Sequence, residues 1–385
     1  MNLEVLQIEV TSRCNFNCSY CLRQFWDDSP RDMDMQTFRN VLEEFQSERC
    51  ALYGFGEPLV HEEIEEMVKL ASKFSEVLLV TNGSLDVQKV LKHVDFLGIS
   101  LDSADPEFLK SVRRNAEFER ISENIKRAMK ETEVELEAVI MRENLDELES
   151  FVKWAGELGV DVSFSNLVPY SREMYGSVAF VELSKKPLEI YREMIGEYPK
   201  KERFLLDIAL GKRDAVELYN RIWERVREEG YSINLHRILL EEGRIKLAER
   251  AERILERCRE ISEEYGIQLK VPKVFGEERG RECPYSDGIF VRADGRIAPC
   301  MELAYTHSEY LNNHEKRVTS YFLDSKIVED EFQKRKKLLN ELTPWCGNCP
   351  YASFCWYVEE SRDCYANKPS CSECLYSAGI SRCIL

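Results

Sequence analysis

Three cysteines stand close together near the start of the chain, in the order Cys14-Asn-Phe-Asn-Cys18-Ser-Tyr-Cys21. Thiolates are soft ligands that suit iron, and a loop this short brings them to one place. A 4Fe–4S cube takes four ligands, so a triplet of thiolates leaves one iron open. The spacing therefore predicts an iron–sulfur site with a position free for a small chelating molecule.

Zinc is the main alternative for such a loop, followed by a set of buried structural cysteines. Structural zinc usually takes four ligands, often as pairs of cysteines separated by two residues. The triplet offers three cysteines, and its first pair is separated by three residues. The spacing favours the iron–sulfur interpretation over both alternatives.

The elements around the triplet predict a parallel α/β sheet. Residues 3–10 combine aliphatic and β-branched side chains in partial alternation, which is typical of a strand. Strands are also expected at 50–54, 77–81, 96–102, 134–140 and 160–169. Helices are expected at 35–45, 62–74, 118–132 and 145–158, with one more between residues 83 and 96. Six such units imply parallel strands with right-handed crossovers. Parallel barrels carry their chemistry at the carboxyl ends of strands, where the triplet lies.

The triplet, with Tyr20 before its last cysteine, resembles the signature loop of the radical S-adenosylmethionine (radical SAM) superfamily. The resemblance implies an α/β fold, an open (β/α)6 partial TIM barrel, over residues 1–183. It also implies that SAM binds the open iron through its amino and carboxylate groups. One electron from the cluster would then release methionine and a 5′-deoxyadenosyl radical, which abstracts hydrogen from a substrate.

The same resemblance assigns SAM contacts at later strand ends. The stretch Gly54-Phe-Gly56-Glu57-Pro58 is similar to the family's GGEP motif, with Phe55 in place of the second glycine. Backbone carbonyls there would accept hydrogen bonds from the SAM amino group, while Glu57 would support the loop. Glycine permits such close approach of a ligand to the backbone.

Further candidate SAM contacts follow the third and fourth strands: Asn82, Ser100 and Asp102. Either Arg113 or Arg114 would pair with the SAM carboxylate, because a guanidinium matches that group geometrically. A surface pair of arginines is the alternative for these two. Asn144 and Asn166 are weaker candidates, no histidine is assigned a role, and no catalytic acid or base is identified.

The second half of the chain carries a second group of cysteines. After residue 282 stand Cys283, Cys300, Cys346, Cys349, Cys355, Cys364, Cys371, Cys374 and Cys383. The pattern Cys283-x11-Gly295-x4-Cys300 resembles the opening of the SPASM domain, an auxiliary-cluster module of radical SAM enzymes. The residues from 289 to 300 also predict a β-hairpin with an Asp-Gly turn. We therefore expect a SPASM domain at 271–385, after a charged helical segment at 184–270 with helices at 214–229 and 248–265.

The SPASM resemblance implies two auxiliary 4Fe–4S clusters, although one spacing departs from the family. Cys346-x2-Cys349-x5-Cys355 matches the family run, but Cys364 follows after eight residues instead of three. One cluster would use that run and a later cysteine, and the other Cys283, Cys300 and Cys364. The ligands still missing would come from Cys371, Cys374 and Cys383. A zinc ribbon of Cys346 and Cys349 with Cys371 and Cys374 is the rival, whereas Cys50 and Cys258 are expected to be buried thiols.

Composition excludes several other classes of function. The formal net charge of −17 makes a nucleic acid an unfavourable partner. No apolar run is long enough to cross a membrane, and no leader precedes Leu3, so we expect a cytoplasmic protein. Charged residues make up 32% of the chain, which is compatible with a thermophilic anaerobe. The fourteen cysteines are expected to hold metal rather than disulfides.

Two classes of function remain open at this stage. The first is a radical SAM enzyme that acts on a protein, peptide or cofactor client, with a ferredoxin- or flavodoxin-type electron donor. The second is a non-catalytic iron–sulfur carrier, which would not need an open iron or the contacts at the strand ends. The run from Asp363 to Gly379 resembles archaeal SPASM proteins described as maturases of tungsten-cofactor oxidoreductases. We therefore favour maturation of a tungsten- and pterin-containing enzyme or its cofactor.

The alternative within the enzyme class is maturation of a peptide or protein, either sulfatase-maturase-like or by crosslinking a ribosomal peptide. Many such relatives carry a winged domain ahead of the barrel to bind a leader peptide. Here the first strand begins by Leu3, so the chain is expected to lack that domain. Peptide modification would then need a separate binding partner or direct recognition of a folded protein.

Overall fold

The computed structural model describes residues 2–24, 26, 28–167, 174, 176–180, 183–229, 242–276, 288–298, 301 and 304–305. Within these residues, nine strands form one sheet in the order β11-β10-β1-β2-β3-β4-β5-β6-β8. Of the predicted metal ligands, only Cys14, Cys18 and Cys21 fall inside this range. All cysteines from Cys283 onward lie outside the described residues, so the predicted SPASM domain stays a prediction.

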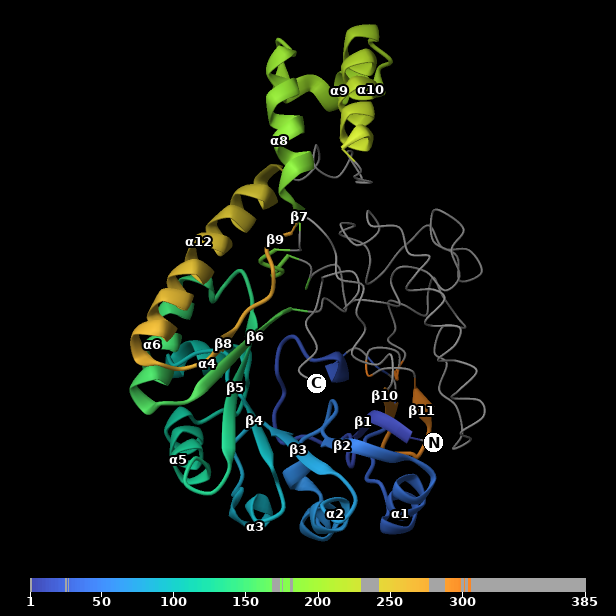
Figure 1. The fold of residues 1–385 in the computed structure, drawn as a ribbon, viewed down its shortest axis with the longest axis vertical. Helices are drawn as coiled ribbons and strands as arrows, with labels where there is room; N and C mark the ends of the chain where they lie inside the picture. The colour runs from blue at the N-terminus through green and yellow to red at the C-terminus, as the bar shows by residue number, and fades with distance from the viewer. Residues whose placement is uncertain are drawn as a thin grey trace.

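The predicted (β/α)6 partial barrel is confirmed. Six strands run parallel in sequence order: β1 (Asn2–Ile8), β2 (Gln46–Leu52), β3 (Glu76–Thr81), β4 (Phe96–Ser100), β5 (Glu133–Ile140) and β6 (Asp161–Asn166). The helices between them are α1 (Met35–Glu44), α2 (Ile64–Ala71), α3 (Gln88–Leu91), α4 (Pro106–Val112), α5 (Phe118–Ala128) and α6 (Leu148–Leu158). Figure 1 shows these helices along the outer side of a curved, open sheet.

Short 3₁₀ turns join several of these elements: η1 (Leu22–Gln24), η2 (Pro58–Val60), η3 (Leu145–Glu147), η4 (Ile195–Glu197) and η5 (Lys201–Arg203). Helix α4 was not among the predicted helices, although its start carries a clear signal. The Asp105 carboxylate accepts a hydrogen bond from the Phe108 backbone at 2.7 Å, and Pro106 begins the helix. This is the favoured chemistry of a helix N-terminus.

Strands from later in the chain extend the sheet at both edges. β8 (Leu269–Lys270) pairs with β6, and β10 (Gly288–Val291) pairs in parallel with β1. β10 then turns back into the antiparallel β11 (Ile297–Ala298), which confirms the predicted hairpin. Its turn places Gly295 at φ 78°, a conformation that glycine adopts without strain. Residues after 183 thus complete the edges of the sheet.

The sheet has one face against the helices and one face turned away from them. On β4, Leu97 and Ile99 belong to the large core that also contains Ile121 and Ile125 of α5. Because side chains alternate along a strand, Gly98 and Ser100 point to the opposite side. We call that side the inner face of the sheet.

The two halves of the inner face differ in chemistry. Over β1 to β3 a small apolar cluster forms from Val5, Ala51 and Tyr53, with Leu78, Val80 and Met301 packed against it. The buried Gln7 amide lies among them and donates to the Tyr53 carbonyl at 3.2 Å. Over β4 to β6 the alternation places mostly small or polar residues on the inner face: Gly98, Ser100, Glu135, Glu137, Ser163 and Ser165. Phe96 and Val139 are the apolar exceptions there. A ligand on the inner face would therefore meet a mostly apolar half and a mostly polar half.

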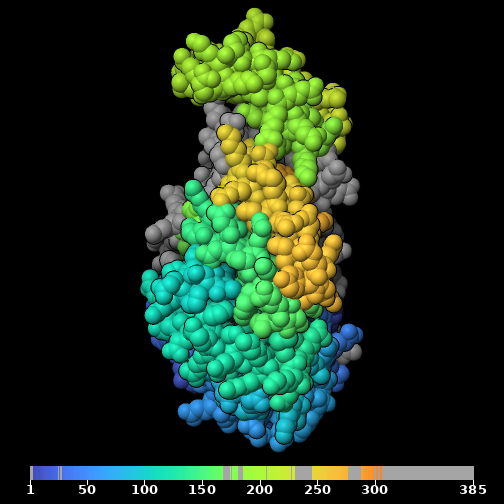
Figure 2. All heavy atoms as spheres, turned by 90° about the vertical axis from the view of Figure 1, so that its left-hand side faces the viewer, coloured from blue at the N-terminus to red at the C-terminus, as the bar shows by residue number. Residues whose placement is uncertain are grey.

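A helical arm extends from the sheet and carries its own core. It consists of β7 (Leu183–Ser184), α8 (Lys185–Met194), α9 (Phe204–Ala209) and α10 (Arg213–Glu228), and β7 pairs with β9 (Phe275–Gly276). Leu188, Phe204, Leu218 and Ile222 are buried in this arm. Figure 2 shows the arm projecting beyond α12 (Glu242–Tyr265) at one end of the molecule. α10 and α12 confirm the two helices predicted for this segment.

Two cysteines expected to be buried thiols are indeed buried: Cys50 in β2 and Cys258 in α12 have no exposed surface. Burial raises the pKa of each thiol to about 12. Both are therefore protonated core residues. Among the described residues, no helix combines the length and apolar character that a membrane crossing requires.

Candidate active site

The cysteine triplet lies in the loop that leaves the carboxyl end of β1. Its thiols are free and partly exposed. The end of α4 fixes this loop through its backbone: Ser19 N–H donates to the Val112 carbonyl at 2.9 Å, and Asn17 N–H to the Arg114 carbonyl at 3.4 Å. The Asn115 amide also donates to the Asn15 carbonyl at 3.2 Å. The fold therefore holds the loop in place through contacts remote in sequence.

The three thiols lie close enough to influence one another. Burial raises the pKa of Cys18 to about 12, the Arg113 charge opposes the rise, and the neighbouring Cys21 and Cys14 thiolates add to it. A metal that binds here must displace the thiol protons and supply the compensating positive charge. In the described part of the chain, no three potential ligands gather around one point as a single ion would need. A 4Fe–4S cube would take one thiolate on each of three irons, and the three cysteines of this loop supply that number of ligands.

The predicted glycine motif lies directly against this loop. A Cβ atom on Gly56 would fall 1.9 Å from the Thr11 carbonyl oxygen, so only glycine fits there. The next residue, Glu57, donates its backbone N–H to the Arg13 carbonyl at 2.8 Å. A Cβ atom on Gly54 would meet the Glu9 side chain at 2.5 Å. Both glycines thus allow the end of β2 to approach the end of β1.

Glu57 joins the ends of two strands, as expected of a supporting residue. Its buried carboxylate accepts hydrogen bonds from Leu59 N–H at 3.0 Å, from the Thr81 hydroxyl at 2.7 Å and from Asn82 N–H at 2.7 Å. Burial raises its pKa, while these donors act in the opposite direction. Pro58 follows as the first residue of η2. No sequence signal assigned Glu57 these specific partners.

Asn82 connects the third strand to the cysteine loop. Its side-chain amide donates to the Asn15 side-chain oxygen at 2.9 Å and lies 3.9 Å from Cys14 Sγ. Its oxygen accepts from the Ser84 hydroxyl at 2.6 Å. The structure therefore places Asn82 next to a predicted cluster ligand.

Asp102 lies at the centre of a buried polar cluster beneath the cysteine loop. It accepts a hydrogen bond from the Tyr20 hydroxyl at 2.5 Å and from Val139 N–H at 3.0 Å. Arg113 binds it through two nitrogens, at 2.7 and 3.1 Å. The predicted SAM contacts Asp102 and Arg113 thus bind each other. Arg113 Nη1 has no hydrogen bond within the described residues, whereas the Arg114 side chain faces solvent.

The remaining candidates take different positions. Ser100 is partly exposed on the inner face. Asn144 is structural, because it donates to the Asp102 and Val139 carbonyls at 3.1 and 2.9 Å and accepts from Met141 N–H at 2.8 Å. Asn166 is buried, and its side-chain nitrogen lacks a hydrogen-bond partner within the described residues.

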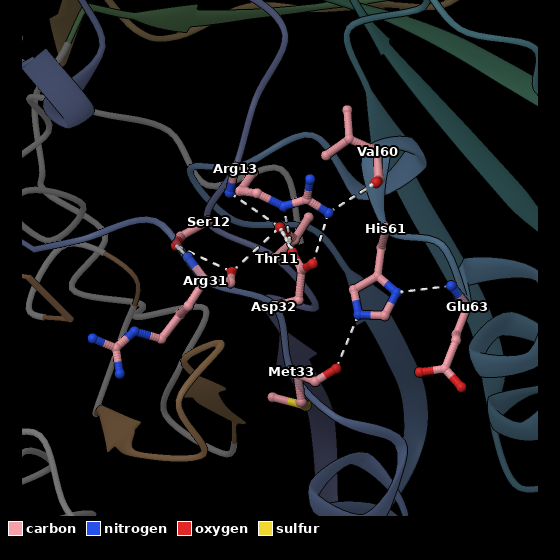
Figure 3. Close-up of polar contacts among 9 residues, drawn as sticks. All are labelled: Thr11, Ser12, Arg13, Arg31, Asp32, Met33, Val60, His61 and Glu63. Atoms are coloured by element: carbon pink, nitrogen blue, oxygen red, sulfur yellow. Dashed lines mark hydrogen bonds and ion pairs between the residues drawn. The ribbon is translucent and has the colours of Figure 1, made fainter.

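A further network fixes the segment between β1 and the cysteines (Figure 3). Arg13 pairs with Asp32 at 2.6 Å and donates to the Val60 carbonyl at 3.2 Å. His61 Nδ1 accepts from Glu63 N–H at 3.0 Å, which leaves Nε2 to donate to the Met33 carbonyl at 2.9 Å. The histidine is therefore a structural residue. The network ties the cysteine segment to the loops before α1 and α2.

Sequence reasoning missed a buried group beside the glycine motif. Glu9 accepts hydrogen bonds from Phe55 N–H at 2.8 Å and from the Tyr305 hydroxyl, and burial raises its pKa to about 7. Trp26 packs on Tyr305 with ring centroids 4.1 Å apart and on Phe55 at 5.6 Å. The only signal was Phe55, which stands where the family pattern has glycine. Tyr305 lies 296 residues from Glu9, a distance that no local pattern bridges.

Residues 8–155 match the Radical SAM superfamily model. The tungsten-containing aldehyde ferredoxin oxidoreductase cofactor-modifying protein of Pyrococcus furiosus is 25% identical over 412 aligned positions, covering 99% of this chain and 97% of that protein. GTP 3′,8-cyclase of Peptoclostridium acidaminophilum is 33% identical over 187 positions, covering 44% of this chain and 56% of the cyclase.

A solved structure has a similar fold. The structure of polyhistidine-tagged anSMEcpe with bound AdoMet has a TM-score of 0.50 and 17% identity, and the likeness covers 97% of this chain and 91% of that one. The family match extends from the carboxyl end of β1 into α6, so it includes the cysteine loop and the strand ends around it. A 4Fe–4S cluster and SAM are implied with it. The part of the chain that the match covers, residues 8–155, is therefore a radical SAM domain.

Proposed function

We propose that this chain is a radical SAM enzyme that matures a tungsten- and pterin-containing oxidoreductase by modifying the client protein or its cofactor. One observation carries the proposal: the similarity to the Pyrococcus furiosus cofactor-modifying protein spans 99% of this chain and 97% of that relative. A match confined to the barrel would indicate only the shared chemistry. Similarity over both full lengths supports a related client as well.

In this proposal Cys14, Cys18 and Cys21 hold the cluster that binds SAM. When bound, that cluster supplies one electron and an open iron, and SAM supplies the 5′-deoxyadenosyl radical. Backbone carbonyls of the Gly54–Pro58 stretch accept hydrogen bonds from the SAM amino group. Arg113 offers Nη1 to the SAM carboxylate, and Asp102 fixes the orientation of the guanidinium through its two hydrogen bonds.

The cysteines after residue 282 hold two auxiliary 4Fe–4S clusters in this proposal, within a SPASM domain at 271–385. Nine thiols exceed the eight that two cubes need. A zinc ribbon in their place would give bound zinc and less iron. Iron, sulfide and zinc analysis of the anaerobically purified chain separates these two assignments.

An electron donor of ferredoxin or flavodoxin type completes the proposal, because the cluster must be reduced for each cleavage of SAM. The chain itself has a formal net charge of −17. A donor or client would therefore approach it through a face with basic residues. Association that weakens steeply as salt rises would support this electrostatic contact.

Co-expression of a tungsten oxidoreductase tests the maturase assignment. The client is produced with the wild-type chain, with the Cys14/Cys18/Cys21→Ala variant, or alone, and its tungsten, pterin and activity are measured. We expect full maturation only with the wild-type chain. A client that acquires metal, pterin and activity in its absence would refute the assignment and move peptide maturation ahead.

A further inference from the structure

Glu137 occupies the middle of β5, on the polar half of the inner face. In the strand register it stands between Ser100 of β4 and Ser163 of β6. A Cβ atom on Gly98 would lie 2.4 Å from Glu137 Oε1, so the carboxylate extends over this glycine. Its register neighbours Ser100 and Ser163 are both small, so neither carries a long side chain that could cover the carboxylate.

Glu137 differs from the acid next to it on the same face. Glu135 pairs with Lys270 of β8 at 2.6 Å. The Glu137 carboxylate makes no hydrogen bond or ion pair within the described residues, although it remains partly exposed on the inner face. Burial raises the pKa of Glu137 to about 8, the Glu135 charge adds to the rise, and Arg113 and Lys270 oppose it. An acid held in this way is costly for the fold and is characteristic of functional sites.

The other half of the inner face has the chemistry that a ring face requires. Leu78 and Val80 of β3 are partly exposed there, next to Tyr53 and Ala51. Small-molecule sites combine apolar walls with a few polar groups that fix orientation. A mostly apolar half, across from a carboxylate that has no partner among the described residues, suits a flat heterocycle with hydrogen-bond donors on one edge.

We propose that Glu137 binds the amino-pyrimidinone edge of the substrate ring, a donor edge shared by pterins and guanine. Each ring has an N–H beside an exocyclic amino group, and both donors point the same way. The two oxygens of a carboxylate accept such a pair of hydrogen bonds, as they accept the fork of an arginine. The inference rests on the proposed function and deepens it, since it names the class of ring that the enzyme recognises.

Ring binding would also reduce the free-energy cost of ionising the Glu137 carboxylate. Two donors aimed at Glu137 favour its ionised form, which burial alone disfavours. Gly98 permits this arrangement, because any side chain there would occupy the position of the carboxylate. The free acid and the glycine beneath it thus form one feature, in which the glycine provides the room and Glu137 the acceptors.

Equilibrium binding to the anaerobically purified full chain tests the proposal without any client. The probes are pterin and guanosine, with lumazine and xanthosine as matched controls in which an oxo group replaces the amino group. The variants are Glu137→Gln and Glu137→Asp. Glu133→Gln serves as the protein control, because Glu133 lies on the same strand and is exposed.

We expect the wild-type chain to bind pterin or guanosine about tenfold more tightly than the corresponding oxo ring. Glu137→Gln should lose about tenfold in affinity, Glu137→Asp should lose part of it through its shorter reach, and Glu133→Gln should bind like wild type. Preference for guanosine over pterin would assign the site to a guanine substrate. The ratio of amino to oxo ring on the wild-type chain needs no variant, so it stands even if Glu137→Gln fails to fold.

Equal affinity for amino and oxo rings would overturn the proposal, as would unchanged pterin binding by Glu137→Gln or no binding of either amino ring. The outcome is independent of the co-expression experiment. Ring selectivity without client maturation would retain Glu137 as the ring-binding residue and refute the maturase function. Maturation without ring selectivity would retain the maturase function and refute the role of Glu137 in ring binding.

Discussion

Two acids from neighbouring strands of the barrel differ in their hydrogen-bond partners. Asp102, at the carboxyl end of β4, accepts hydrogen bonds from Tyr20, Arg113 and the Val139 backbone. Glu137, deeper in the sheet on β5, has no such partner within the described residues. Within the part of the chain that the structure describes, the hydrogen-bond donors gather around Asp102 at the mouth of the barrel, and none reaches Glu137 on the inner face.

This contrast separates a scaffold from a binding surface. Asp102 orients Arg113 and the cysteine loop before any ligand arrives, because a buried acid with a full set of donors is rigid. In our proposal, Glu137 keeps its acceptors for the substrate ring. A site that binds SAM and the cluster needs side chains that are already held in position, as Asp102 is. A site that recognises a substrate needs an acceptor that is still available, as we propose for Glu137.

The largest effect is expected from removing the cysteine triplet at the mouth. Cys14/Cys18/Cys21→Ala should abolish formation of 5′-deoxyadenosine from SAM and dithionite, because no ligand remains for the cluster that binds SAM. Chromatography of the reaction mixture measures it. The iron bound by the C-terminal cysteines should remain, and undiminished cleavage by this variant would contradict the assignment of the triplet.

Breaking the Asp102 cluster should come next. Asp102→Ala leaves the Arg113 charge buried without its partner, which costs about 3–5 kcal/mol of folding stability. Denaturant unfolding measures this loss. Arg114→Ala is the control, because the exposed Arg114 side chain should contribute within about 0.5 kcal/mol. Equal effects of the two variants would show that Asp102 does not organise the mouth.

Adding a side chain where the glycine motif touches the cysteine segment should have an intermediate effect. Gly56→Ala forces a Cβ atom onto the Thr11 carbonyl and should cost about 1–3 kcal/mol, with loss of SAM cleavage. Gly196→Ala is the matched control, because a Cβ atom there meets nothing within 4 Å. Thermal unfolding and SAM cleavage together check the prediction, and wild-type behaviour of Gly56→Ala would refute it.

The smallest effect concerns the pH dependence of stability at Glu137. Its folded pKa of about 8 lies above the ordinary value of 4.5, so the wild-type chain loses stability as pH rises through this window. Glutamine cannot ionise, so Glu137→Gln should gain on wild type across this window. Solvent reaches the partly exposed carboxylate and screens it, so we expect a gain on the order of 1 kcal/mol, below the limit of about 1.4 kcal/mol per pH unit that the unscreened shift would set. Glu135, Lys270 and Arg113 act on this acid and are present in both proteins.

Thermal unfolding of the two proteins across this pH range measures the difference between them. Other titrating groups, including Glu9 with its pKa of about 7, cancel in the comparison. A difference that stays flat with pH would mean that Glu137 is solvated and ordinary. That result would also remove the contrast with Asp102.

The sequence predicted the architecture well because the fold rests on local patterns. Hydrophobic periodicity located all six central strands, and the Asp-Gly turn located the β10–β11 hairpin. Errors fall at element boundaries: β2 begins at Gln46 rather than at residue 50, because its first half is polar and lies among exposed positions. The placement of β10 beside β1 could not be predicted, because this pairing joins residues that are far apart in the sequence, such as Val5 and Gly288.

The sequence identified individual residues of the site but not the contacts between them. The sequence showed the cysteine triplet and the glycine motif directly, because the residues of each lie within one short loop: Cys14, Cys18 and Cys21, and Gly54–Pro58. That Arg113 rather than Arg114 turns inward depends on Asp102 and on the end of α4, which only the folded chain brings together. Glu137 gave no signal, because its isolation depends on Lys270 pairing with Glu135 from a distant strand.

The most direct test of the account is radical chemistry that depends on a client. The anaerobically purified chain is supplied with SAM, dithionite and an immature tungsten oxidoreductase carrying its pterin, and 5′-deoxyadenosine is measured against mature client formed. The account predicts that the two rise together and that neither forms with the Cys14/Cys18/Cys21→Ala variant. Mature client without 5′-deoxyadenosine, or formation of both by the variant, would contradict it.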